Sequence, residues 1–127
     1  METGIKGKKE LTVTEELTAQ AVGSGGLKVF ATPCMISLME STASGSVKGE
    51  LPEGQSTVGT LINVTHLSAT PIGMKVWCES ELTAVDRRRL VFSVKAYDEK
   101  GLIGEGSHER FIVDDEKFMK KCQDKLQ

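Results

Sequence analysis

The sequence predicts an α+β fold in which one apolar helix is covered by a long antiparallel sheet. Two observations lead to this prediction. A single apolar helical pattern follows Thr32-Pro33, and from Thr57 onward the chain reads as successive strands joined by short turns. Strands with such short connections pair antiparallel, because a parallel pair needs a crossover of a dozen or more residues.

The helix is predicted to begin at Thr32-Pro33, because a hydroxyl residue at the N-cap followed by proline is a typical helix start. Apolar residues then recur at helical spacings, at Met35, Ile36, Leu38, Met39 and Ala43. Gly45 and Gly49 are expected to end the helix. A second, charged helix is expected on the surface from about Asp115 to the C-terminus.

The strands are predicted from alternation of apolar and polar residues. The residues expected to share the inner face are Val58, Ile62, Val64 and His66, then Val76, Cys78, Leu82 and Ala84, then Leu90, Phe92, Val94 and Ala96. Pro71-Ile72-Gly73, Asp86-Arg87-Arg88 and Asp98–Gly101 are the predicted turns, and the last strand runs from Leu102 to Val113. A further strand is expected near Leu11–Thr18.

Length and composition fit one domain over residues 1–127, with enough chain for one core. Hydrophobic residues make up 39% and charged residues 27%, with a net charge of -2. This balance gives no general attraction to nucleic acid or to an anionic membrane, so neither is an expected partner. Three scattered cysteines argue against a disulfide framework, and the polar Met1–Glu10 segment is not a signal peptide, so a cytoplasmic location is expected.

Four residues are candidates for chemistry, and each also has an ordinary structural explanation. His66 is predicted to face the helix, where a histidine is more often a core residue than a catalyst. His108 fits a local group of hydrogen bonds in the last strand. Glu40 lies either at the helix edge or in a pocket that would raise its pKa. Thr32 is explained by capping, although its hydroxyl and the helix N-terminus could also receive negative charge.

The one concentrated basic feature is Arg87-Arg88-Arg89. Most such runs are solvated turns, whereas a nucleotide-bearing ligand such as coenzyme A offers phosphates that arginine would bind. The sequence has no phosphate-binding glycine loop, dinucleotide fingerprint, zinc-ligand spacing or serine-nucleophile motif. Neither a metal nor a nicotinamide cofactor is therefore expected.

The segments Gly59–Pro71, Arg88–Leu90 and Ile103–Arg110 resemble the fluoroacetyl-CoA thioesterase-like family of hotdog-fold proteins. Val29–Thr32 and Met35–Glu40 are similar to the helix entry and helix of that family. The resemblance implies a hotdog fold, an antiparallel sheet wrapped around a central helix. It also implies an acyl-CoA substrate, with coenzyme A as part of that substrate, and a homodimer with sites near the subunit interface.

Residue by residue, the resemblance places a catalytic threonine, glutamate and histidine at Thr32, Glu40 and His66. It places a glycine near the thioester at Gly59 and an active-site arginine at Arg110, while Arg88 and Arg89 are candidates for binding the phosphates. On this reading His66 is a general base, acting on Thr32 or on water, and Glu40 orients it.

The sequence departs from the family before the helix. Members selective for fluoroacetyl groups have aromatic lid residues there, but Val22–Leu27 has none, so a short or medium acyl group is expected. Two alternatives remain open at this point. One is a non-catalytic acyl-CoA sensor or scaffold, in which His66 and Glu40 only line a pocket, and the other is a hotdog hydratase or dehydratase.

Overall fold

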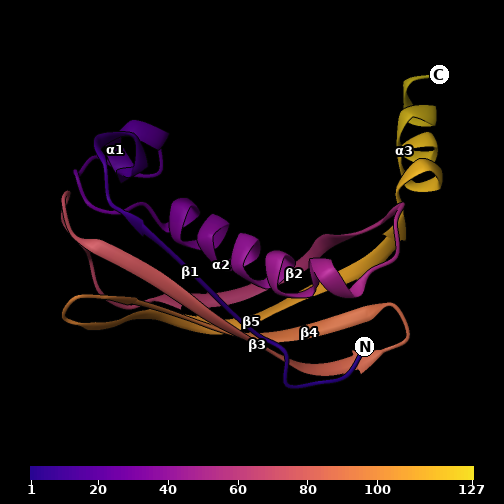
Figure 1. Cartoon of the computed structure of the whole chain (residues 1–127). Helices are drawn as coiled ribbons and strands as arrows, with labels where there is room; N and C mark the ends of the chain where they lie inside the picture. Colours follow the sequence, from indigo (N-terminus) through magenta and orange to yellow (C-terminus); the bar gives the residue numbers. More distant parts are fainter.

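The computed structural model describes residues 1–127 as a five-stranded antiparallel sheet with one long helix on its concave face (Figure 1). The helix is α2 (Thr32–Val47). The strands are β1 (Lys6–Thr12), β2 (Gln55–His66), β3 (Lys75–Asp86), β4 (Arg89–Asp98) and β5 (Gly101–Asp114), in the spatial order β1-β3-β4-β5-β2. The predicted α+β class is confirmed.

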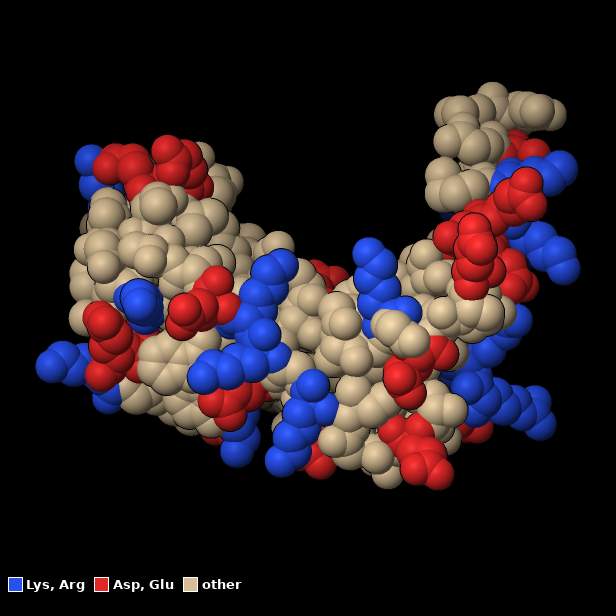
Figure 2. All heavy atoms as spheres, viewed as in Figure 1, with Lys and Arg blue, Asp and Glu red and all other residues tan.

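Two short helices stand at opposite ends of the molecule. They are α1 (Ala19–Val22) and the predicted C-terminal helix, α3 (Asp115–Gln123), which projects from the end of β5 (Figure 1). α2 runs between them (Figure 1), and acidic and basic side chains are interspersed over the side of the molecule that Figure 2 shows. None of the helices is long and apolar enough to cross a membrane.

The core is formed where α2 packs on the central strands. Met35, Met39, Ala43 and Val47 are fully buried on the helix. They face the buried residues of β3 and β4, which are Val76, Cys78, Leu82, Leu90, Phe92, Val94 and Ala96. Burial of each large apolar side chain contributes roughly 1.5–3 kcal/mol. Gly45 does not end the helix as predicted, because the next turn still buries Val47.

The predicted strand at Leu11–Thr18 is wrong. β1 lies earlier, at Lys6–Thr12, and Glu15–Leu17 forms a 3-10 turn. The reason is the extent of the neighbouring strand: Thr12 pairs with Lys75, the first residue of β3, and backbone pairing ends one residue later, where Val13 donates to Met74 and accepts from Gly73.

Two β-bulges also correct the predicted faces. The register of β2 shifts between Gly59 and Leu61, and that of β3 shifts between Leu82 and Ala84. One extra residue reverses the alternation beyond it. Val58 therefore pairs with the exposed Phe111 instead of sharing the inner face with Val64 and His66, and Ala84 is exposed. Gly59, opposite the buried Arg110, takes the inner position.

β2 and β5 approach each other closely because two residues of β5 lack a Cβ. A Cβ at Gly106 would lie 2.6 Å from the Cα of Val64 and would also meet the Asn63 carbonyl. A Cβ at Gly104 would lie 2.6 Å from Met35 Sδ and 2.8 Å from the Thr65 carbonyl oxygen. Because these two residues have no side chain, the end of β2 that carries His66 can lie close to β5 and α2.

We expect Gly106→Ala to lower the free energy of unfolding by about 2–4 kcal/mol, because the new methyl group collides with the backbone of β2. Gly45→Ala is the matched control: a Cβ there meets nothing within 4 Å, and alanine stabilises a helix interior by about 0.5–1 kcal/mol. Urea denaturation of both variants measures the difference. Equal stability of the two variants would contradict the close approach of β2 and β5.

Candidate active site

Thr32 and His66 form the first part of the site. The Thr32 hydroxyl lies 2.7 Å from Nδ1 of His66, the last residue of β2. Thr32 is not the N-cap as predicted, because Ala31 holds that position and α2 starts at Thr32. The hydroxyl makes no capping hydrogen bond and is free to bond the histidine. The structure thus joins the start of the helix to the end of β2.

The second ring nitrogen of His66, Nε2, is buried and has no hydrogen-bond partner. Burial lowers the pKa of His66, since it disfavours the charged imidazolium. At neutral pH the ring is therefore uncharged, with one nitrogen carrying hydrogen and the other accepting. A neutral imidazole hydrogen-bonded to a hydroxyl can take up the proton of that hydroxyl, as in hydroxyl nucleophiles paired with a base.

A small pocket opens beside this pair. It encloses about 270 Å³, and its lining includes Thr32, His66, Phe30, Ala19 and Ser24. The last two residues come from α1 and the glycine-rich segment after it, where Gly23 has φ 79°. The segment without aromatic residues that the sequence singled out thus forms one wall next to the catalytic candidates.

The second part of the site lies further along the sheet, around Glu40. Glu40 Oε2 is 3.9 Å from Nη1 of Arg110, and the two residues flank Gly59. A Cβ on Gly59 would be 2.8 Å from that carboxylate oxygen and 3.4 Å from Arg110 Nη1. Glycine is therefore required at residue 59 for the carboxylate and the guanidinium to lie against the strand.

Arg110 is held rigidly by β2. Its Nε donates to Thr57 Oγ1 at 2.8 Å and its Nη2 donates to the Thr57 carbonyl oxygen at 2.9 Å. The Arg110 side chain is 9% exposed, whereas that of Glu40 is 43% exposed. The carboxylate therefore remains open to a ligand while the guanidinium stays fixed beneath it.

His108 belongs to a local group of hydrogen bonds in β5, as the sequence predicted. Its Nε2 lies 3.1 Å from Nη1 of Arg110, and its Nδ1 lies 2.8 Å from the Leu61 carbonyl oxygen. Because guanidinium only donates, Nε2 accepts and Nδ1 carries the hydrogen. Burial and the charge of Arg110 lower the pKa of His108, with burial the larger cause. The contact between His108 and Arg110 could have been predicted from the sequence, because residues two apart on a strand share a face.

Within one chain, the two parts of the site do not meet. Gly59 and His66 are seven residues apart on β2, which corresponds to roughly 23 Å. Glu40 contacts Arg110 and lies against Gly59, whereas His66 contacts Thr32. The structure therefore brings together two of the three predicted catalytic residues, and it groups the third with the predicted binding residues.

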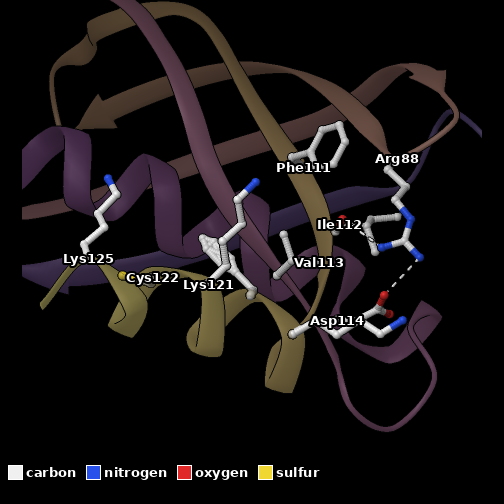
Figure 3. Close-up of a pocket in the computed structure, with 10 residues that line it drawn as sticks. Arg88, Phe111, Ile112, Val113, Asp114, Lys121, Cys122 and Lys125 are labelled. Atoms are coloured by element: carbon white, nitrogen blue, oxygen red, sulfur yellow. Dashed lines mark hydrogen bonds and ion pairs between the residues drawn. The ribbon is translucent and has the colours of Figure 1, made fainter. Parts of the chain in front are cut away.

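Arg88 and Arg89 lie apart from both groups. Arg89 forms a two-pronged pair with Glu109 at 2.8 and 2.9 Å. Arg88 donates to the Ile112 carbonyl oxygen at 3.3 Å and lies 3.5 Å from Asp114 Oδ2. Arg88 also lines a separate groove beside α3 (Figure 3).

Comparison with known proteins places this geometry in a family. The family model described as fluoroacetyl-CoA-specific thioesterase matches residues 13–116. The chain belongs to this family. The match includes α2, all of β2 to β5 and every residue of the two groups described above, and it confirms the resemblance that the sequence predicted.

Individual relatives agree with this assignment. The fluoroacetyl-CoA thioesterase of Streptantibioticus cattleyicolor is 42% identical over 98 residues, which cover 77% of this chain and 70% of the relative. A solved structure of the fluoroacetyl-CoA thioesterase is 34% identical, with a TM-score of 0.92 over 98% of this chain and 97% of the other. A thioesterase superfamily member from Thermus thermophilus is 27% identical, with a TM-score of 0.89 over 98% and 95%. The predicted hotdog fold is confirmed.

We expect the free energy of unfolding to fall as the pH drops from about 7.5 to 5.5. Both histidines have lowered pKa values in the folded protein, so the unfolded chain binds protons first, from about pH 6.5 downward. The stabilisation that the two neutral histidines contribute is complete above about pH 6.5. It is lost as the pH falls toward the pKa that these histidines have in the folded protein. Urea denaturation at several pH values measures the slope.

His108→Asn and His66→Ala should each flatten this slope, because the chain has only these two histidines. The slope is compared instead of the absolute stability, since each substitution also changes packing. A wild-type free energy of unfolding that stays constant over this pH range would contradict the neutral, buried state of both rings.

Proposed function

We propose that the protein hydrolyses an acyl-CoA thioester with a short or medium acyl group, giving the free acid and coenzyme A. The observation that carries this proposal is the 2.7 Å contact between Thr32 Oγ1 and His66 Nδ1 beside a small pocket, in a member of a thioesterase family. The short or medium acyl group is proposed because Val22–Leu27, part of which lines this pocket, has no aromatic residues.

In the proposed reaction His66 is the general base. It removes a proton either from Thr32 or from a water molecule, and the resulting oxygen attacks the thioester carbonyl carbon. The carbon–sulfur bond then breaks, and the leaving thiolate takes the proton from His66. If Thr32 attacks first, water hydrolyses the acyl-threonine in a second step by the same proton transfers. Water is the only co-reactant, so no cofactor is proposed.

The Glu40 group is proposed to hold the thioester from the other side. The backbone amide of Gly59 can approach the carbonyl oxygen closely, since no Cβ intervenes. Arg110, fixed by Thr57 and His108, keeps the Glu40 carboxylate in place through their 3.9 Å pair. In this proposal the Glu40 carboxylate stabilises the imidazolium of the histidine that receives the proton.

Such a role requires a histidine that lies nearer than His66 of the same chain, and a homodimer supplies one. β2 is an edge strand, and its residues 59–63 are exposed, with Leu61 44% and Ile62 37% exposed. Exposed edges with apolar residues favour pairing with another chain. If two copies of β2 pair antiparallel about an axis near Ile62–Asn63, Gly59 of one copy lies opposite residue 66 of the other.

We therefore propose that each active site combines Thr32 and His66 of one subunit with Glu40, Gly59 and Arg110 of the other. The exposed edge of β2 and the separation of the two groups within one chain support this arrangement. A cytoplasmic location is proposed as well, supported by the three free cysteines Cys34, Cys78 and Cys122.

The activity is tested with acyl-CoA substrates from acetyl to medium and aryl chains, by following loss of thioester absorbance. Wild type should turn over at least one short or medium substrate. His66→Ala should reduce kcat by about 10²–10⁴-fold, the usual contribution of a general base. Thr65→Ala is the matched control, since Thr65 is exposed next to His66. Binding without turnover on every substrate would instead favour the acyl-CoA sensor.

The shared site is tested by mixing two inactive variants, Glu40→Ala and His66→Ala, after dissociation and reassociation. In a mixed dimer, one site then has both substitutions and the other has neither. Statistical mixing should restore about one quarter of the wild-type activity. No restored activity, with mixed dimers shown by native mass spectrometry, would contradict a site shared between subunits.

A further inference from the structure

The loop that follows β2 lies between the two residues of the proposed catalytic pair. It runs over residues 67–71, directly after His66. The backbone N–H groups of its first two residues donate to the Ile103 carbonyl oxygen at 2.6 and 3.3 Å, and three of its residues line the pocket beside Thr32 and His66. The position of this loop therefore sets one wall of the pocket.

The same loop is hydrogen-bonded to the chain that enters α2. The Phe30 N–H donates to the Thr70 carbonyl oxygen at 2.9 Å. Phe30 is buried and comes two residues before Thr32, whereas Thr70 comes four residues after His66. The backbone of Thr70 therefore connects the segment that carries His66 to the segment that carries Thr32.

The side chain of Thr70 is fixed by a buried carboxylate at the end of β4. The Thr70 hydroxyl donates to Asp98 Oδ2 at 2.7 Å, and the Lys100 backbone N–H donates to Asp98 Oδ1 at 2.8 Å. Asp98 is 5% exposed and Thr70 is 0% exposed, and Asp98 forms no ion pair. Burial of a carboxylate is unfavourable unless it accepts hydrogen bonds, and hydrogen bonds to a charged acceptor are strong. The Thr70 hydroxyl is therefore held firmly.

The turn between β4 and β5 explains only one of these two hydrogen bonds. Aspartate in a turn commonly accepts from the backbone N–H two residues later, which is that of Lys100 here. That bond uses Oδ1, and the turn does not require Oδ2. Oδ2 instead joins the turn to Thr70, which is 28 residues away in the chain.

Thr32 and His66 need such support because both lie where regular structure ends. Thr32 is the first residue of α2 and His66 is the last residue of β2, and the ends of elements open most readily. Thr32 is also exposed, so packing around its side chain does not maintain the 2.7 Å contact with His66. A displacement of about 1 Å between reacting groups can lower a rate about 10²-fold.

We propose that Asp98 is a positioning residue for this reaction and that it acts through Thr70. The proposal rests on the hydrolysis proposed above. The carboxylate fixes the Thr70 hydroxyl, and the Thr70 backbone then holds the segment before Thr32 against the loop after His66. This keeps the Thr32 hydroxyl at hydrogen-bond distance from His66 Nδ1. Neither Asp98 nor Thr70 lines the pocket itself.

The kinetic test begins with Thr70→Val, which removes the hydroxyl and keeps the shape of the side chain. It should lower kcat by roughly 10- to 100-fold and leave KM nearly unchanged, because no residue that lines the pocket is altered. Thr70→Ser keeps a hydroxyl and should retain most of the wild-type kcat. Thr42→Val is the matched control, since Thr42 is 3% exposed and its hydroxyl donates to the Leu38 carbonyl oxygen at 2.7 Å. This control also loses a buried hydroxyl, but its kcat should equal that of wild type.

A second set of variants tests whether Asp98 acts through Thr70. Asp98→Asn keeps an oxygen for the Lys100 N–H but removes the charge, and it should also lower kcat. The double variant Asp98→Asn/Thr70→Val should have the kcat of Thr70→Val alone, because both changes break the same contact. Independent, additive losses overturn the proposal, and so does an equal loss in Thr42→Val. Should Thr70→Val fail to fold, Asp98→Asn is compared with Thr42→Val in the same way.

NMR of the histidine rings tests the proposal without a substrate. The chain has only two histidines, so His66→Ala assigns both sets of ring resonances. Thr70→Val and Asp98→Asn should shift the resonances of His66, because its hydrogen bond to Thr32 weakens, and should leave those of His108 unchanged. Such shifts support the positioning role even if no acyl-CoA is hydrolysed. Unchanged His66 resonances in both variants overturn it.

Discussion

The packing of α2 on the sheet is the interaction on which the rest of the structure depends. The buried residues of this helix fix both its height above the strands and its rotation about its own axis. Thr32 and Glu40 are eight residues apart, roughly 12 Å along the helix axis. Once the helix is seated, Thr32 can reach only the far end of β2, and Glu40 can reach only the strand region near Gly59.

Glycines on β2 and β5 allow these strands to pack closely against α2 and against each other. Gly104 and Gly106 let β5 lie close to Met35 and to the backbone of β2, so that His66 comes within hydrogen-bond distance of Thr32. Gly59 leaves room for the Glu40 carboxylate. The polar residues at the edge of α2 therefore require glycines at the strand positions that they face, because a larger side chain there would collide with them.

The bulge in β2 and the chain of hydrogen bonds beneath it work together. His108 accepts from Arg110 and donates to the carbonyl oxygen of Leu61, which is the residue just after the bulge. This chain joins the irregular part of β2 to the guanidinium that faces Glu40. Buried polar groups of this kind are costly unless all of them are paired, and here the pairing also fixes the tautomer of His108.

The sequence by itself determined the fold class, the long helix, the four strands after Thr57 and the family. The fold class, the helix and the strands follow from local periodicity, and the family follows from the resemblance of short segments; neither requires knowledge of contacts between distant residues. It did not determine which residues face inward beyond the bulges at Gly59–Leu61 and Leu82–Ala84, because a bulge depends on the partner strand. Nor did it show that His108 fixes Arg110, or that Glu40 lies with Arg110 and not with His66 of the same chain. Those relations join residues far apart in the chain, and only the tertiary packing of α2 on the sheet decided which of them meet.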